Sequence, residues 1–240
     1  MRAFLLAAGL GTRLKPLTDT TPKALVQING VTLLELIIKR LISFGFDSII
    51  INVHHFGDQV INFLNEKNNF GIEIKISDEQ DQLLDTGGGL KKVSAFFNDK
   101  KPFLVHNVDI LSDLNISELY NYHLKLNSIA TLAVQNRKSS RYFLFDQEKN
   151  LCGWKNENPL ETKTARQTTG TITQLAFSGI QIIDPKIFEF MPEKNIFSLV
   201  DLYLSIASKE RISYFDHSGS LFFDLGKKEN LIQAEKFYNK

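Results

Sequence analysis

Apolar runs alternate with helix-period segments through the first half of the chain. Four short apolar or alternating runs have the length and character of strands: 3–8, 48–53, 72–77 and 103–108. Between them lie three segments with the character of helices: 32–44, 58–67 and 89–97. Strands that alternate with helices in this way are typical of βαβ units, which stack into a mainly parallel sheet.

The first helix has signals at both ends. Thr32 and Glu35 have the spacing of a capping box, and Gly45 supplies a stop after Phe44. Apolar residues recur with helical period on one face: Leu33, Leu36, Ile37, Leu41 and Phe44. The sequence therefore predicts one helix that begins after Thr32 and ends near Phe44.

The second half contains more strand than helix. Strands are expected at 129–135, 142–146, 151–154 and 172–183, and a closing helix at 227–237. Residues 155–171 are polar and predict a long loop. The whole pattern predicts a three-layered α/β fold. Its mixed sheet is mainly parallel and carries an antiparallel extension. A chain of 240 residues with 43% hydrophobic content fits a single domain over 1–240.

Charge and cysteine content narrow the functional classes. Lys and Arg total 28 against 27 Asp and Glu, a net charge of +1, so no strong positive field is available for nucleic acid. Cys152 is the only cysteine, which excludes an internal disulfide and suits a reducing compartment. The apolar run 3–8 is too short for a secretory signal, and nothing approaches a membrane span. We expect a cytoplasmic protein without nucleic-acid or membrane partners.

The segment GLGTRLKPLT, residues 9–18, follows the first strand directly. A dinucleotide fingerprint needs glycine where Leu14 stands, and a P-loop needs Gly-Lys-Ser/Thr where Leu14-Lys15-Pro16 stand. Both motifs are therefore excluded. Pro16 disfavours helical geometry at Lys15, so the sequence predicts an extended loop that continues to Lys23.

The residue types of this loop suit polyphosphate. Gly9 and Gly11 allow the backbone to approach a ligand closely, so that amides can point at phosphate oxygens. Arg13 offers a planar fork, and Lys23 offers a compact point charge. The competing interpretation is a glycine-rich surface turn with solvated charges. We favour the polyphosphate loop, because so many suitable residues cluster after one buried strand.

The segment from Leu5 to Gly30 resembles the signature of the sugar-1-phosphate nucleotidyltransferases, also called NDP-sugar pyrophosphorylases. The matching positions are Gly9, Gly11, Thr12, Arg13, Pro16, Thr18, Pro22 and Lys23. The resemblance implies a Rossmann-like fold that joins a nucleoside triphosphate to a sugar 1-phosphate and releases pyrophosphate. It implies catalytic roles for Arg13 and Lys23. It also implies nucleotide contacts at Ala7, Ala8, Gly9, Gly11, Thr12 and Asn107.

Two aspartates match the family's magnesium ligands. Asp109 ends the stretch FLVHNVD, where Val108 replaces the usual glycine, and Asp224 lies in LFFDLG. The resemblance implies that these two carboxylates hold Mg²⁺ together with phosphate oxygens and water, ligands that this ion prefers. Either aspartate alone would be an ordinary turn or cap residue.

The stretch LLDTGGGLKK resembles the family's second glycine-rich loop, with Asp85 in place of the first glycine. Its Thr-Gly-Gly-Gly form, Thr86 to Gly89, looks most like that of uridylyltransferases acting on N-acetylmuramate 1-phosphate. By this resemblance Gly87 and Gly88 lie against the base and Gly89 contacts the sugar substrate. Glu79 or Gln80 would read the base edge. UTP is therefore the expected nucleotide.

Contacts to the sugar follow from weaker matches. The stretch FSGI resembles a family strand in which Ser178 and Gly179 face the sugar. The family's Glu-Lys-Pro element is represented only by Glu161-Thr162-Lys163, so Lys163 and Arg166 are equal candidates for binding the sugar phosphate.

Two other functions compete with nucleotidyl transfer. A glycosyltransferase that consumes a nucleotide sugar would carry Asp-x-Asp, where this chain has Asn107-Val108-Asp109. A nucleotide-sensing domain would have no need to keep both aspartates together with Arg13 and Lys23. We expect a transferase acting on two small-molecule substrates, as a monomer or small homo-oligomer.

Overall fold

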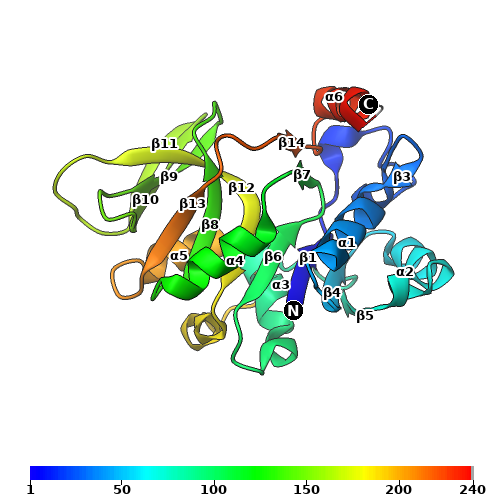
Figure 1. Ribbon diagram of the computed structural model, residues 1–240, viewed down its shortest axis with the longest axis horizontal. Coiled ribbons are helices and arrows are strands. Elements are labelled where there is room, and N and C mark those ends of the chain that lie inside the picture. Colours follow the sequence, from blue (N-terminus) through cyan, green and yellow to red (C-terminus); the bar gives the residue numbers. More distant parts are fainter. Residues whose placement is uncertain (239–240) are drawn as a thin grey trace. The chain divides into compact units, whose positions relative to one another are not determined.

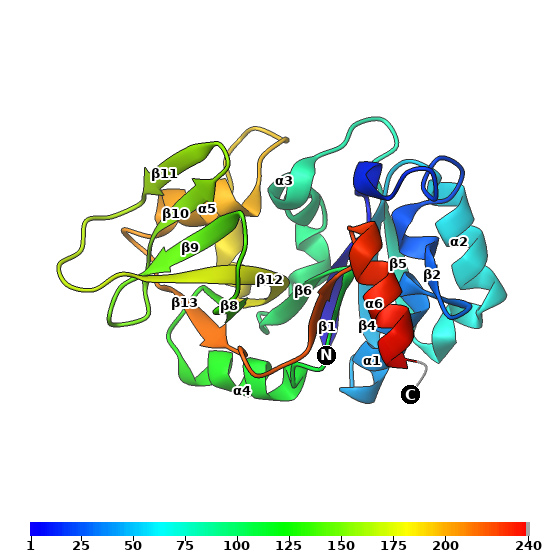
Figure 2. The ribbon, with the colours of Figure 1, turned by 90° about the horizontal axis from the view of Figure 1, so that it is seen from above.

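The computed structural model describes residues 1–238, and contacts within the chain divide it into two compact units. The first unit comprises Met1–Leu84, Val105–Asp113 and the chain from Leu221 onward. The second comprises Asp85–Leu104 and Leu114–Ser220. The ribbons of Figures 1 and 2 show the elements of each unit. That the chain forms a single nucleotidyltransferase domain stays a prediction.

The first unit is built on parallel strands. β1 (Arg2–Leu6), β4 (Ser48–Val53) and β5 (Glu73–Asp78) pair in parallel with β4 in the middle. β6 (Phe103–Asn107) lies on the other side of β1. Every residue of β4 is buried, as expected of a parallel strand covered on both faces. The parallel core predicted from the alternating pattern is therefore confirmed.

Thr32 forms the predicted N-cap, whereas the Glu35 carboxylate pairs with Lys39 and Lys67. Helix α1 (Leu33–Ser43) begins after Thr32, whose hydroxyl accepts a hydrogen bond from the backbone N–H of Glu35 at 3.1 Å. Phe44 caps the other end, and Gly45 follows with a φ of +79°. The left-handed conformation that ends the helix is available to glycine at little cost.

The first unit is completed by short elements that connect its strands. Its other helices are α2 (Gly57–Glu66) and α6 (Lys228–Tyr238), and its 3₁₀ turns are Thr12–Leu14, Lys23–Leu25 and Asn68–Gly71. Two small antiparallel ladders pair β2 (Gln27–Ile28) with β3 (Val31–Thr32), and β7 (Ile110–Ser112) with β14 (Phe222–Asp224).

The second unit is dominated by antiparallel strands. They are β8 (Ala130–Gln135), β9 (Arg141–Phe145), β10 (Leu151–Glu157), β11 (Leu160–Thr164), β12 (Thr173–Ile183) and β13 (Ile212–Asp216). β12 pairs with both β8 and β9, β10 pairs with β9 and β11, and β13 alone joins β8 in parallel. This is the expected antiparallel extension, so the predicted α/β class with a mainly parallel sheet is confirmed.

Three helices and two 3₁₀ turns accompany these strands. They are α3 (Asp85–Lys92), α4 (Ile116–Lys125), α5 (Leu199–Ile206), Ser94–Phe97 and Pro185–Phe190. The lone cysteine, Cys152, is buried in β10, where its thiol donates to the carbonyl of Leu144 at 3.3 Å. Burial raises the pKa of this thiol, which disfavours the reactive thiolate form.

Two local predictions were wrong. The expected loop 155–171 contains the end of β10 and all of β11, because Asn158-Pro159 forms a turn that returns the chain against β10. The helix expected from 89 begins earlier, at Asp85, and ends at Lys92 before a separate 3₁₀ turn. Tertiary contacts override the low helix propensity of its glycines, because the N–H groups of Gly87 and Gly88 donate to the Phe197 carbonyl.

No helix within residues 1–238 combines the length and the apolar character needed to cross a membrane.

Two buried histidines make the fold sensitive to acid. Burial lowers the pKa of His106 in β6 and of His123 in α4 to about 4, against an ordinary value of 6.5. Because the unfolded chain binds these protons more readily, stability is full above pH 6.5 and falls as the pH approaches 4.

We therefore expect the unfolding midpoint in urea to decrease between pH 6.5 and 4.5, and the decrease should begin well above 4.5, the ordinary pKa of a glutamate. Replacing His123 by Asn should flatten part of this decrease. A midpoint independent of pH across this window in the unsubstituted protein would contradict the prediction.

Candidate functional site

The glycine-rich loop after β1 is held by one side chain. Gly11 has a φ of +63°, and the hydroxyl of the buried Thr18 donates to its carbonyl at 2.9 Å. A Cβ at Gly11 would lie 2.9 Å from the methyl group of Thr18, so both conformation and space require glycine here. The predicted extended loop contains two 3₁₀ turns, of which the first buries Leu14.

Lys23 and Asp109 form an ion pair inside the first unit. The Lys23 ammonium donates to Oδ2 of Asp109, and the two side chains are 14% and 9% exposed. The backbone around Asp109 is fixed as well, since Val108 N–H donates to the Leu6 carbonyl and Leu225 N–H donates to the Asp109 carbonyl. The carboxylate therefore has a defined position at the carboxyl end of β6, where ligands collect in open α/β sheets.

A short antiparallel ladder brings the second aspartate to the first. β14 pairs with β7 so that Asp224 lies opposite Ile110, next to Asp109 in the chain. Arg13 approaches from the glycine-rich loop, with Nη1 3.8 Å from Oδ2 of Asp224. Two predicted metal ligands and two predicted catalytic cations thus meet within one unit.

Gly226 marks the centre of this charged cluster. A Cβ at Gly226 would lie 2.6 Å from Nη2 of Arg13, 2.9 Å from Oδ2 of Asp109 and 3.0 Å from Oδ1 of Asp224. Any side chain here would enter the space between the charges. Glycine therefore leaves the space between these charges free of a side chain.

The donor set fits a hard divalent cation. Within residues 1–238 no three or more His, Cys, Asp or Glu side chains are arranged to hold a metal ion. An ion at the cluster would therefore have the oxygens of Asp109 and Asp224 and complete its shell with phosphate oxygens and water. Mg²⁺ is commonly bound with one or two carboxylates in this way.

A buried network, not anticipated from the sequence, fixes the end of β1. The side-chain oxygen of Asn52 in β4 accepts from the backbone N–H groups of Ala7 and Ala8, at 2.7 and 3.3 Å. Its amide group donates to Oε1 of Glu79 at 2.8 Å, and Oε2 of Glu79 accepts from Leu84 N–H at 3.1 Å. A polar residue inside the apolar run of β4 was the signal that could have revealed this role.

The network defines the surroundings of several predicted nucleotide contacts. Glu79 is only 2% exposed and both its carboxylate oxygens are hydrogen-bonded, whereas Gln80 is exposed. The amides of Ala7 and Ala8 are likewise engaged by Asn52. The remaining predicted nucleotide contacts in this unit, Gly9, Thr12 and Asn107, are exposed or half-buried.

The glycine-rich helix start belongs to the second unit. The N–H groups of Gly87 and Gly88 both donate to the carbonyl of Phe197, and Leu199 N–H donates to the Thr86 hydroxyl. A Cβ at Gly87 would lie 2.5 Å from the Phe197 ring. Packing against Phe197 therefore accounts for Gly87, and a contact to the base stays a prediction, as does the sugar contact of the buried Gly89.

Ser178 and Gly179 lie in the long strand β12. The Ser178 hydroxyl is fully buried and lies 2.8 Å from Nε2 of His217, and Gly179 is buried with a φ of +70°. Ser178 thus has a partner within the protein, and its predicted contact with the sugar is not needed to explain its burial.

The candidates for the sugar phosphate differ in their surroundings. The guanidinium of Arg166 pairs with Asp146 and donates through Nε to the Leu151 carbonyl at 3.1 Å. Lys163 in β11 is exposed, with Nζ 3.1 Å from Oδ1 of Asp201, and Glu161 is exposed in the same strand. The Arg166 guanidinium is therefore already bound by groups of the protein, and Lys163 is the more accessible cation.

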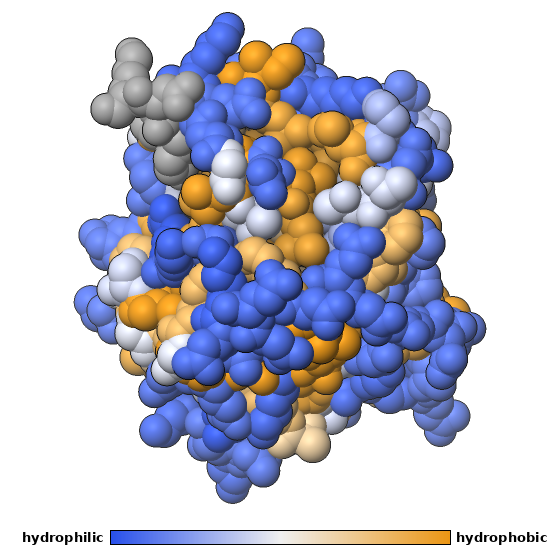
Figure 3. Space-filling view, turned by 90° about the vertical axis from the view of Figure 1, so that its right-hand side faces the viewer, coloured by the Kyte–Doolittle hydropathy of each residue, from blue (hydrophilic) through white to orange (hydrophobic). Residues whose placement is uncertain are grey.

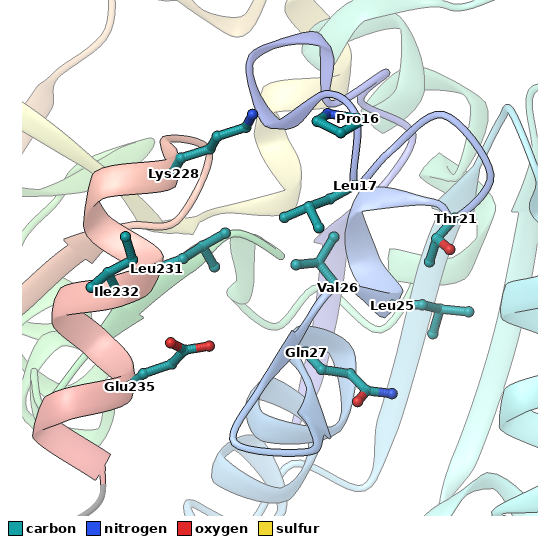
Figure 4. A pocket seen from close by; sticks show the side chains of 10 residues that line it. All are labelled: Pro16, Leu17, Thr21, Leu25, Val26, Gln27, Lys228, Leu231, Ile232 and Glu235. Atoms are coloured by element: carbon teal, nitrogen blue, oxygen red, sulfur yellow. The ribbon is translucent and has the colours of Figure 1, made fainter.

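An apolar pocket of about 590 Å³ also lies in the first unit, between the glycine-rich loop and α6. Figure 4 shows Leu17 and Val26 facing Leu231 across it, with Lys228 near one end and Glu235 near the other. Figure 3 shows apolar side chains exposed among hydrophilic ones on one face of the molecule. The four charged residues of the cluster do not line this pocket, so it is separate from the candidate phosphate site.

The sequence as a whole matches a family model described as nucleotidyl transferase, over residues 2–240. The chain belongs to this family. The resemblance to sugar-1-phosphate nucleotidyltransferases, and the enzyme class that it implies, are thereby confirmed.

Individual relatives of this nucleotidyltransferase are named for the transfer of different nucleotides. The N-acetylmuramate alpha-1-phosphate uridylyltransferase of Neisseria meningitidis is 29% identical over 235 residues, which cover 98% of this chain and 97% of that protein. A mannose-1-phosphate guanyltransferase of Yarrowia lipolytica is 26% identical over 243 residues, covering 99% of this chain and 64% of that protein.

A solved structure shares the fold. The crystal structure of a putative glucose-1-phosphate thymidylyltransferase from Bacillus anthracis superimposes with a TM-score of 0.80 at 20% identity, covering 99% of this chain and 94% of that one. At this identity the likeness concerns the fold alone.

Replacing Asn52 by Leu should destabilise the nucleotidyltransferase. The substitution keeps the side-chain size but leaves two buried amides and one oxygen of the buried Glu79 carboxylate without the partner that Asn52 supplies, each at a cost of about 1–3 kcal/mol. We expect a loss of at least about 2 kcal/mol in urea unfolding. Asn62→Leu serves as the control, because Asn62 is exposed on helix α2, and equal losses in the two variants would contradict the role of the network.

Proposed function

We propose that this nucleotidyltransferase joins UTP to a sugar 1-phosphate and releases pyrophosphate, with Mg²⁺ bound beside the reacting phosphate. The convergence of Arg13, Asp109 and Asp224 around Gly226, with Lys23 paired to Asp109, carries the proposal. Such a cluster offers cations to a triphosphate and carboxylates to a divalent ion at the same place.

The reaction needs no general base. A sugar 1-phosphate oxygen attacks the α-phosphorus, a new oxygen–phosphorus bond forms, and the bond from the α-phosphorus to the bridging oxygen breaks. Pyrophosphate leaves with that electron pair. Because the second pKa of a phosphate monoester is about 6, the nucleophile is already ionised at neutral pH and no proton must move. Catalysis then rests on alignment and on stabilisation of charge.

The chain's own residues supply both. Lys23, next to the glycine-rich loop, steadies the α-phosphate, and Arg13 draws charge onto the departing pyrophosphate with its planar fork. Asp109 and Asp224 would hold Mg²⁺, which supplies Lewis-acid neutralisation of phosphate oxygens when bound. Gly9 and Gly11 let the backbone follow the phosphate tail closely.

The choice of UTP and of an amino sugar such as N-acetylmuramate 1-phosphate rests on two supports. One is the Thr86-Gly87-Gly88-Gly89 sequence. The other is the full-length relative from Neisseria meningitidis, named for that uridylyl transfer. Lys163 and Glu161 are proposed to contact the sugar phosphate and the sugar, since both side chains are exposed.

Pyrophosphate exchange tests the reaction directly. Labelled pyrophosphate should enter UTP when a UDP-sugar and Mg²⁺ are supplied, because the transfer is reversible. A nucleotide-sensing domain would bind UTP without exchange, and a glycosyltransferase would release UDP without labelled UTP. A panel of triphosphates and sugar 1-phosphates, read by pyrophosphate release, then identifies the base and the sugar.

Replacing Arg13 by Ala should depress turnover far more than stability. Loss of one charge-stabilising donor costs about 10²–10³-fold in kcat. Lys15→Ala is the matched control, because Lys15 is an exposed cation of the same loop that pairs only with Asp19 at 3.2 Å among the described residues. A turnover number of the purified Arg13→Ala protein equal to that of the control would reject the role of Arg13.

Replacing Asp109 by Asn should have opposite effects on binding and turnover. The substitution removes the charge that holds Lys23, so UTP without metal should bind more tightly, measured by calorimetry in the presence of a chelator. Turnover with Mg²⁺ should fall, because one carboxylate of the cation site is lost. Asp19→Asn is the control, as an exposed aspartate of the same loop. Metal-free binding weaker than in the control would contradict the proposed competition for Lys23.

A further inference from the structure

Strand β11 is an open edge of the second unit. Among the residues that the structure describes, Leu160–Thr164 pair only with β10, and β11 is the terminal strand of its sheet order. All five residues are exposed, and Leu160 is 75% exposed. Open edges invite pairing with another strand, and proteins usually protect them.

The backbone of this edge presents a regular set of unpaired groups. Ala165 lies opposite Cys152, and its N–H donates to the Cys152 carbonyl. Hydrogen-bonded positions alternate in an antiparallel ladder, so Lys163 and Glu161 also bond toward β10. The N–H and C=O groups of Leu160, Thr162 and Thr164 therefore point away from the sheet.

The side chains of β11 are complementary to a second copy of themselves. When two such strands pair antiparallel about Thr162, Thr162 faces its own copy and Leu160 faces Thr164. Glu161 then faces Lys163 twice, once on each side of the symmetry axis. Opposite charges in such cross-strand pairs attract, so residues that would protect a lone edge become favourable in this register.

The backbone and the side chains select the same register. Pairing about Thr162 makes Leu160, Thr162 and Thr164 the hydrogen-bonded positions, and each of the three pairs exchanges two N–H···O bonds. Glu161 and Lys163 then occupy the non-hydrogen-bonded positions, where cross-strand side chains come closest. If the register shifted by one residue, the outward N–H and C=O groups of one strand would no longer face those of the other. Glu161 would then lie opposite Thr162.

We propose that two copies of this chain associate through antiparallel pairing of their β11 strands, centred on Thr162. Lys163 then exchanges its exposed contact with Asp201 for Glu161 of the second copy, at small cost because exposed ion pairs contribute little. Leu160 loses much of its contact with water. The interface is small, so the dimer should be weak and its population should change over an accessible range of protein concentration.

The interface can be tested separately from the reaction. Glu161 and Lys163 are also proposed to contact the sugar substrate, so the test reads mass and amide protection and does not use activity. Failure of pyrophosphate exchange leaves the interface untouched, and a monomeric chain leaves the transfer reaction untouched.

Charge reversal provides the sharpest test. Sedimentation of the full chain over a concentration series should show a monomer–dimer equilibrium. Glu161→Lys and Lys163→Glu each place like charges opposite one another twice, and each should weaken dimerisation by at least about tenfold, equivalent to 1.4 kcal/mol. The double variant E161K/K163E restores both pairs and should restore dimerisation. Lys138→Glu reverses the charge of an exposed residue outside β11 and should leave dimerisation unchanged.

Two further measurements complete the test. Thr162→Pro removes the central outward N–H, a change that an edge strand tolerates, and should leave the chain folded by circular dichroism but monomeric. Hydrogen exchange should show protection of the amides of Leu160, Thr162 and Thr164 that increases with concentration. A wild-type chain that stays monomeric throughout the series, or a double variant no better than the single ones, would overturn the proposal.

Discussion

The ion pair between Lys23 and Asp109 is the interaction on which the candidate site depends. It joins residues 86 positions apart and places a cation from the glycine-rich loop against the carboxyl end of β6. With Arg13 and Asp224 the cluster contains two positive and two negative charges, so the substrate-free site neutralises itself. A metal–triphosphate complex carries the same two kinds of charge and can replace each internal pair by an external one. The charged side chains are thus already gathered in the substrate-free protein, and binding of such a complex would require exchange of these internal pairs.

The sequence predicted those elements whose start, end and pattern depend on residues close to them in the chain. The cap at Thr32 and the stop at Gly45 lie within a few residues of the helix that they bound, and β4 is apolar along most of its length. The four charged residues were also found from the sequence, because the family signature places each of them. The resemblance also implies that Asp109 and Asp224 meet, but the three-residue ladder between β7 and β14 that brings them together carries no periodic signal and could not be predicted.

Features that depend on tertiary contacts were missed or misread. The start of α3 is fixed by the Phe197 carbonyl, which receives two amides from a distant glycine pair. β11 was mistaken for loop because its residues are polar, and a strand exposed on its edge has no apolar face to reveal it. Asn52 stood out only as one polar residue in an apolar strand. Its importance comes from Ala7, Ala8 and Glu79, which neighbouring strands bring to it.

Cys152 offers an experimental opportunity that follows from its burial in β10. It is the single thiol of the chain, and its sulfur is shielded beside the Leu144 carbonyl. Because Cys152 is only 3% exposed, a thiol reagent reaches it only after the packing around β10 opens. The rate of alkylation of Cys152 therefore reports how often the second unit opens locally, and no engineered label is needed.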